Sequence, residues 1–140
     1  MNYLIDTCVV SELVKKTPDI QVVQWFNQQQ PTHLFISSVS IAEIKKGLYK
    51  IQLSQPERFE KLQKWLNTLE IQFRHRVLPV TDAVLENWAE ISAKAELQGR
   101  KLAVMDSLIA ATAYRHQLTL VTRNVDDFKD ITVQILNPFQ

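Results

Sequence analysis

Hydrophobic residues along the chain follow two patterns: short uninterrupted runs, and longer stretches in which they recur every three or four positions. Five short runs, rich in branched side chains, predict buried strands. These runs cover residues 3–5, 34–36, 77–80, 118–122 and 133–136. Pro79 interrupts the third run and cannot donate to a strand ladder, so this strand is expected to lie at an edge or to end there.

Helical spacing fills the segments between these runs. A first helix is predicted after an N-cap at Thr17, and it should end near Pro31. A second helix follows Ser38, and a third begins at a capping box formed by Ser54 and Glu57. The second and third helices are therefore expected to form a helical hairpin in the middle of the chain.

The second half of the chain continues the same alternation. A fourth helix is predicted to start with Thr81 or Asp82 as its cap and to end at Gly99. Residues 105–116 are apolar almost all round and predict a helix buried against other elements. Strands separated by helices indicate an α/β fold with three α/β/α layers, a mostly parallel sheet of about five strands, and one domain over residues 1–140.

Composition excludes several classes of protein. Gly47 and Gly99 are the only glycines, so neither the dinucleotide-binding fingerprint nor the P-loop can be present. Cys8 is the only cysteine, which excludes an internal disulfide. There is no signal peptide and no apolar stretch of 18 residues, so we expect a cytoplasmic protein without a membrane partner. The formal net charge of +1 does not indicate a nucleic-acid or membrane partner, so local patches have to be sought.

Acidic residues gather where the predicted strands end. In open α/β sheets, ligands bind outside the carboxyl ends of the strands. The candidates are Asp6 after the first strand, Glu43 in the helix after the second, Asp106 at the start of the buried helix, and Asn124 with Asp126 and Asp127 after the fourth strand.

Each acid also has a purely structural interpretation. Glu43 stands three residues after Ser40 and could complete a capping box, and Asp106 could be an ordinary first-turn acid. Asp6 could belong to a tight turn, and the pair at 126–127 to a solvated one. The case for a site rests on their combination, because residues from four separate segments map to one edge of one sheet.

A cluster of like charges requires a cation. Neighbouring carboxylates raise one another's pKa values unless a cation neutralises them. Oxygen ligands select a hard cation, so Mg²⁺ is expected, with Mn²⁺ as a substitute. A hydrated divalent ion held by carboxylates is suited to phosphodiester hydrolysis.

Four motifs carry a family resemblance. The segments LIDTCVVSEL (4–13) and SVSIAEIKKGL (38–48) resemble the first two motifs of PIN-domain nucleases. VMDSLIAA (104–111) resembles the third, and VTRNVDDF (121–128), with a closing LNPF (136–139), resembles the fourth. The residues in these motifs are most similar to those of the VapC and FitB-like toxins of prokaryotic toxin–antitoxin pairs. The resemblance implies a PIN-like fold and a Mg²⁺-dependent endoribonuclease that acts as such a toxin.

The resemblance also implies roles for individual residues. Asp6 and Asp106 would be the principal metal ligands, and Glu43 a third acid that binds the metal or orients its water. Some relatives place a further acid where this chain has Asn124, so the fourth catalytic position is open among Asn124, Asp126 and Asp127. Cys8 stands where similar proteins often carry asparagine.

Hydroxyl and basic side chains near these acids are secondary candidates. Thr7 and Ser107 could orient the acids from behind, although a threonine after a strand and a serine in a first turn need no function. Of the basic residues near the acidic edge, Lys46 and Arg123 are the first candidates for RNA binding.

The resemblance implies partners as well. We expect a cognate antitoxin protein, a two-fold homodimer and a possible larger toxin–antitoxin assembly. The helix faces that carry Ile20, Trp25, Phe59, Leu62 and Trp65 are apolar enough to serve such contacts. Alternatives are a catalytically silent PIN scaffold that only binds a partner, or a DNA-directed nuclease or phosphatase on the same scaffold. A receiver-type signalling domain is disfavoured because no acidic pair follows the first strand.

Overall fold

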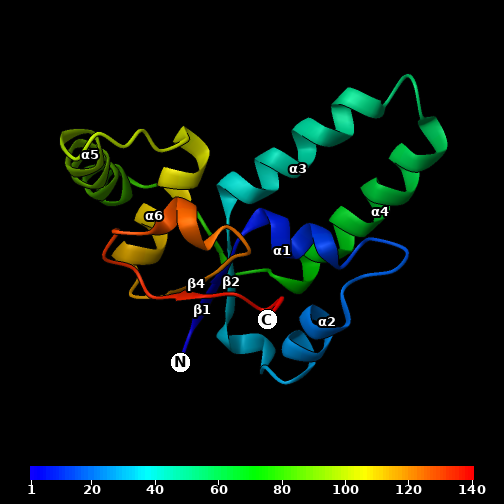
Figure 1. Ribbon diagram of the computed structural model, residues 1–140. Coiled ribbons are helices and arrows are strands. Elements are labelled where there is room, and N and C mark those ends of the chain that lie inside the picture. Colours follow the sequence, from blue (N-terminus) through cyan, green and yellow to red (C-terminus); the bar gives the residue numbers. More distant parts are fainter.

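The computed structural model describes residues 1–140, and its centre is a five-stranded sheet (Figure 1). The strands are β1 (Tyr3–Ile5), β2 (Leu34–Ser37), β3 (Val77–Leu78), β4 (Thr119–Val121) and β5 (Ile135–Leu136). Their spatial order is β3-β2-β1-β4-β5, and every neighbouring pair is parallel. The five predicted strands and the parallel sheet are confirmed, and β3 lies at an edge, as Pro79 led us to expect.

Six α-helices and two short 3₁₀ helices surround the sheet. They are α1 (Thr7–Glu12), α2 (Ile20–Asn27), η1 (Pro31–His33), α3 (Ser38–Ile51), α4 (Pro56–Gln72), α5 (Asp82–Leu97), α6 (Val104–Arg115) and η2 (Val125–Phe128). Figure 1 shows α1, α3 and α4 on one side of the sheet and α5 and α6 on the other. The α3–α4 pair is the predicted helical hairpin, and its far end projects from the body of the molecule. The three-layer α/β/α architecture is confirmed.

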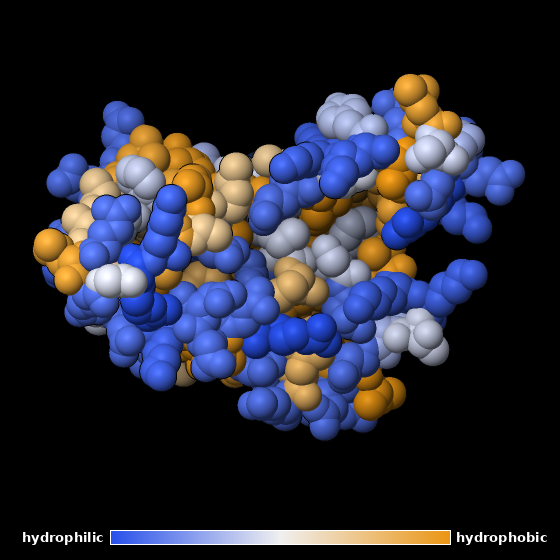
Figure 2. Space-filling view, turned by 45° about the horizontal axis from the view of Figure 1, so that its top comes forward, coloured by the Kyte–Doolittle hydropathy of each residue, from blue (hydrophilic) through white to orange (hydrophobic).

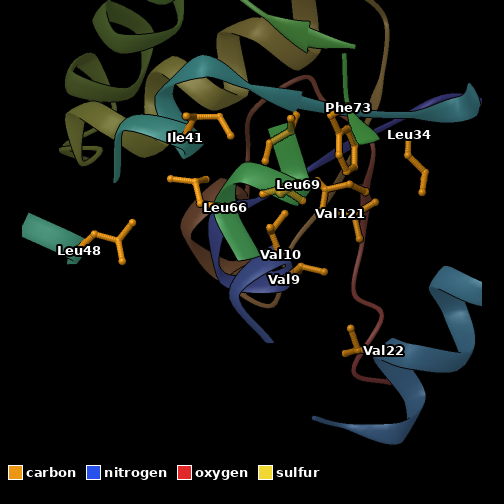
Figure 3. Packing of buried hydrophobic residues seen from close by; sticks show 12 residues of the cluster. Val9, Val10, Val22, Leu34, Ile41, Leu48, Leu66, Leu69, Phe73 and Val121 are labelled. Carbon is orange, nitrogen blue, oxygen red and sulfur yellow. The ribbon is translucent and has the colours of Figure 1, made fainter. Parts of the chain in front are cut away.

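Strand alternation builds two hydrophobic cores, one on each face of the sheet. Leu4 and Ile5 are both fully buried but belong to different clusters, because successive side chains of a strand point to opposite faces. The larger cluster packs the strands against α1, α2, α3 and α4. In Figure 3 the side chains of Val9 and Val10 from α1 approach Leu66 and Leu69 from α4. The smaller cluster packs the opposite face against α6.

Two predicted helix starts are wrong. The Thr17 cap is replaced by Asp19, whose carboxylate accepts the Gln21 N–H at 2.8 Å, so the helix begins at Ile20. The Ser54 capping box does not form. Pro56 occupies the first helical position, where its missing N–H costs nothing, and this makes the residue directly before it the cap.

The other helix boundaries follow the predictions closely, with one omission. Thr81 caps α5, and Gly99, with φ of +79°, ends the turn that follows it. The N–H groups of Gly99 and Arg100 bind the carbonyls of Glu96 and Ala95, a C-terminal motif that requires a left-handed residue. Helix α1 was not predicted, because six residues are too few to display a helical period. None of the helices combines the length and apolar composition needed to cross a bilayer.

Candidate active site

The topology places a crevice at the carboxyl ends of β1 and β4. These strands are neighbours in the centre of the sheet. The connection after β1 runs over the face of the sheet that α1–α4 cover. The connection into β4 comes from α6 on the opposite face, so the two connections separate between β1 and β4. This is a topological switch point, the position at which open α/β sheets bind ligands.

Asp6 lies in this crevice, and its carboxylate is held by several donors. The residue is 3% exposed and caps α1: its Oδ1 accepts the Thr7 N–H at 2.8 Å. The Thr122 hydroxyl donates to Oδ2 at 2.7 Å and itself accepts the Asn124 N–H at 3.0 Å. These bonds compensate for the burial of the carboxylate. Thr122 was not among the predicted site residues, because a hydroxyl directly after a buried strand is the only signal that it offers.

Glu43 comes from α3 and meets α1 through a hydroxyl. The Thr7 hydroxyl lies 2.7 Å from Glu43 Oε1 and 2.7 Å from Ser40 Oγ. Ser37, rather than Ser40, caps α3, so the capping-box interpretation of Glu43 is wrong. The Glu43 carboxylate instead lies beside Thr7, the first residue of α1, which directly follows Asp6 in the chain.

Asp106 stands in the first turn of α6 within electrostatic range of other acids. Desolvation, together with the negative charges of Asp6, Glu43 and Asp127, raises the pKa of its carboxyl to about 6. Asp106 is therefore a first-turn acid, as one of its two predicted interpretations stated. It also lies near other negatively charged side chains. The structure thus brings four of the predicted acids into one electrostatic cluster.

The loop after β4 separates the three candidates for the fourth position. Asp127 lines a depression of about 420 Å³ together with Asp106, whereas Asp126 is absent from its walls. Asn124 contributes its backbone N–H to Thr122. The loop is fixed by Arg100, which donates to the carbonyls of Asp126 and Asp127 at 3.2 Å each. Of the three candidates, Asp127 shares a space with Asp106.

Ser107 has a structural partner instead of a carboxylate. Its hydroxyl donates to the Val104 carbonyl at 2.7 Å and accepts the Trp88 indole N–H at 2.9 Å. This chain ties α5 to the start of α6, the turn that carries Asp106. The Trp88–Ser107 bond could not be inferred from sequence, because it joins side chains from two different helices.

The two predicted RNA-binding residues differ in their surroundings. Lys46 is exposed on α3 and makes no ion pair. The Arg123 guanidinium lies 3.8 Å from the centre of the Phe139 ring and 4.0 Å from the carboxylate of Glu12. Glu12 is itself 5% exposed, and hydrogen bonds from Lys15 and the Asp19 backbone lower its pKa. Arg123 thus also joins the C-terminal segment to α1.

Cys8 lies at the border of the site, where its thiol contacts Asp6. Its sulfur lies 3.5 Å from Asp6 Oδ2 and 3.8 Å from Thr122 Oγ1. Burial raises the pKa of the thiol, and the charge of Asp6 raises it further. The side chain therefore stays protonated at neutral pH and can donate to Asp6.

The donor set suits a hard cation with open coordination positions. No three histidine, cysteine, aspartate or glutamate side chains are already arranged around a single ion position. Mg²⁺ is commonly held by one or two carboxylates, several waters and a substrate phosphate, so it needs no such closed cage. Mutual repulsion at Asp106 is the observation that fits a cation, because a bound positive charge would relieve it.

Known proteins are similar to this chain in sequence and in fold. The PIN domain signature matches residues 3–133. Toxin FitB of Neisseria gonorrhoeae is 30% identical over 138 residues, which cover 97% of this chain and 97% of the relative. VapC ribonuclease Y4jK of Sinorhizobium fredii is 30% identical over 141 residues, with 98% and 97% covered. The crystal structure of FitAcB from Neisseria gonorrhoeae matches with a TM-score of 0.92 at 30% identity, covering 99% of both chains.

Proposed function

Because the chain belongs to the PIN domain family, we propose that it is a Mg²⁺-dependent endoribonuclease and the toxin of a toxin–antitoxin pair. The family identified from the four motifs is confirmed. The names of two relatives, a toxin and a VapC ribonuclease, support the proposed activity. The observation that carries it is the placement of four acids near the switch point of the sheet: Thr7 binds both Asp6 and Glu43, and Asp127 lines one depression with Asp106.

Asp6 and Asp106 would hold the cation, with Glu43 close by. Bound Mg²⁺ would supply a nucleophilic water and stabilise charge on the phosphoryl oxygens. Asp6 is suited to a fixed ligand because Thr122 and the start of α1 set the orientation of its carboxylate. The Trp88–Ser107 bond fixes the turn that carries Asp106.

Glu43 is suited to accept a proton from the attacking water. The Thr7 hydroxyl binds only Oε1, which leaves Oε2 without an intramolecular hydrogen bond. Asp127 lines the space beside Asp106 and would complete the acidic wall. These four carboxylates form the proposed catalytic set.

Partners follow from a toxin role. The toxin of a toxin–antitoxin pair is held inactive by its antitoxin, so we propose a cognate antitoxin protein, a cytoplasmic location and a homodimer, alone or in a larger assembly. Among the helix faces expected to serve such contacts, Ile20 is 68% exposed, whereas Trp25, Phe59, Leu62 and Trp65 pack against the core and keep only part of their surface available.

Cleavage of labelled RNA by the purified protein tests the activity. We expect products with Mg²⁺ or Mn²⁺ and none in excess chelator. Asp6→Asn and Asp106→Asn should remove most activity, and asparagine can still cap α1 in the first variant. Asp82→Asn is the matched control, because Asp82 is an exposed first-turn acid of α5 away from the site.

The same assay separates the alternatives. Undiminished cleavage by both site variants, or by the intact protein in chelator, would contradict the proposed mechanism. Binding of RNA without cleavage under any metal condition would indicate a silent scaffold. Cleavage of DNA in preference to RNA would indicate the DNA-directed alternative.

A further inference from the structure

A groove leads away from the acids between α1 and the α3–α4 hairpin. Thr7 and Glu43 line its end at the site, and its volume is about 790 Å³. Ile44, Leu62 and Trp65 contribute to its apolar floor. In Figure 2 the hairpin stands at the upper right, and the hollow beside it has apolar atoms on its floor and hydrophilic atoms along its sides.

Basic side chains outnumber acidic ones along this groove. Lys15 and Lys16 line it from the turn after α1, and Arg58 and Lys61 line it from α4, whereas the acids are Glu43 and Glu57. Lys15 is bound to Glu12 at 2.8 Å. The other three are exposed and form no ion pair; Arg58 makes only a 3.4 Å hydrogen bond to Gln55.

On the opposite side of the site, Lys101 lines the depression beside Asp106 and forms no ion pair, but the two arginines are engaged. There Arg100 is engaged by the carbonyls of the loop after β4 and lies 3.4 Å from Asp130. Arg123 is engaged by Glu12 and Phe139. The same side also carries Asp126 and Asp127. A net charge of +1 for the whole chain therefore conceals an uneven distribution, because more unpaired basic side chains line the groove than line the depression beside Asp106.

We propose that this groove binds single-stranded RNA next to the cleavage point, with Lys16, Arg58 and Lys61 contacting its phosphates. The inference rests on the proposed ribonuclease function. A polyanion that approaches four carboxylates is repelled, and unpaired cations beside them offset that repulsion and position the backbone. The apolar floor, with the partly buried Trp65, offers a surface for unpaired bases, which a duplex would keep covered.

Salt-dependent binding tests this assignment. Binding of a fluorescent 12-nucleotide single-stranded RNA is followed by anisotropy in chelator, to avoid cleavage, over a series of KCl concentrations. The groove variant combines Lys16→Ala, Arg58→Ala and Lys61→Ala. The control combines Lys64→Ala, Arg74→Ala and Lys94→Ala, which remove the same charge from exposed positions outside the groove. A third protein with Lys16→Arg, Arg58→Lys and Lys61→Arg keeps the charge.

We expect a clear difference between these proteins. Loss of three phosphate contacts should reduce the slope of log K against log salt by about 2 and weaken binding at 0.1 M salt by roughly 30- to 100-fold. The control and the charge-keeping protein should bind like the intact chain. All the substituted side chains are exposed, and thermal melting confirms that the variants fold.

The outcomes separate this inference from the proposed function. If the intact protein cleaves RNA while groove and control variants bind alike, the groove assignment is wrong and the ribonuclease function stands. If RNA binds through the groove but no metal supports cleavage, the function fails and the groove stands. If the groove variant loses only its affinity for a copurifying protein, the groove is a protein interface and the RNA assignment is overturned.

Discussion

Replacing Asp106 by asparagine should stabilise the metal-free protein. The carboxylate of Asp106 is partly desolvated and faces the charges of Asp6, Glu43 and Asp127, which raises its pKa from 3.8 to about 6. Asparagine keeps nearly the same shape but carries no charge. The substitution therefore removes one member of the repelling cluster without opening a cavity.

The pKa sets the size and the sign of the effect. Each pKa unit corresponds to about 1.4 kcal/mol, so a rise from 3.8 to about 6 corresponds to at most about 3 kcal/mol. Solvent screening of this partly exposed group reduces that to about 1–2 kcal/mol. The folded state holds the proton more tightly than the unfolded state, so the free energy of unfolding falls as pH rises from about 4 to about 6. Asp106→Asn should lack this fall.

Thermal melting in chelator at constant ionic strength measures the difference. At pH 7 the Asp106→Asn variant should melt about 3–8 °C above the intact chain. Near pH 3 the two should converge, because Asp106 is then protonated in the folded protein and largely protonated in the unfolded one. Added Mg²⁺ should raise the melting temperature of the intact chain more than that of the variant, because it binds the folded state.

One result would refute the reasoning. If both proteins melt at the same temperature at pH 7 and respond equally to Mg²⁺, Asp106 does not sit in a repelling cluster. Asp82→Asn serves as the control, since this exposed first-turn acid should show neither the pH-dependent difference nor an altered response to Mg²⁺.

Three further substitutions have defined expectations. Thr122→Val removes the donor to Oδ2 of buried Asp6 and should lower the free energy of unfolding by about 1–3 kcal/mol in urea titrations; an unchanged midpoint would contradict that role. Trp88→Phe deletes the indole donor to Ser107 at the start of α6 and should lower the free energy of unfolding by about 1 kcal/mol. In the RNA assay it should reduce kcat and change KM less. Gly47→Ala meets nothing within 4 Å in a helix and should stabilise by about 0.5–1 kcal/mol, whereas Gly99→Ala, at φ of +79°, should destabilise by about 1 kcal/mol; matching signs would refute this.

Local patterns accounted for much of the fold. The short branched runs were sufficient for the strands, since a buried strand needs only a few apolar residues in sequence. Ser38, Thr81 and Gly99 marked helix boundaries to within two residues, because capping involves neighbouring residues. The Thr17 cap failed because Asp19, two residues on, serves as the cap, and the Ser54 cap failed because Pro56 takes the first helical position.

The sequence by itself determined which acids reach the carboxyl edge of the sheet. Asp6 directly follows β1, and in a parallel sheet the ends of all strands meet at one edge. The position of Asp106 at the start of a buried helix was equally local information. The motif resemblance named the family from these same positions.

Only the tertiary structure decided what each of these side chains touches. The hydrogen bond from Thr122 to Asp6 spans 116 positions of the chain, and no local period encodes such a pair. The folded loop after β4 set Asp127 beside Asp106 and engaged Arg100, and the C-terminal segment engaged Arg123. Contacts of this kind depend on the packing of elements from distant parts of the chain, so sequence patterns predict the edge on which the acids gather, and the fold selects their partners.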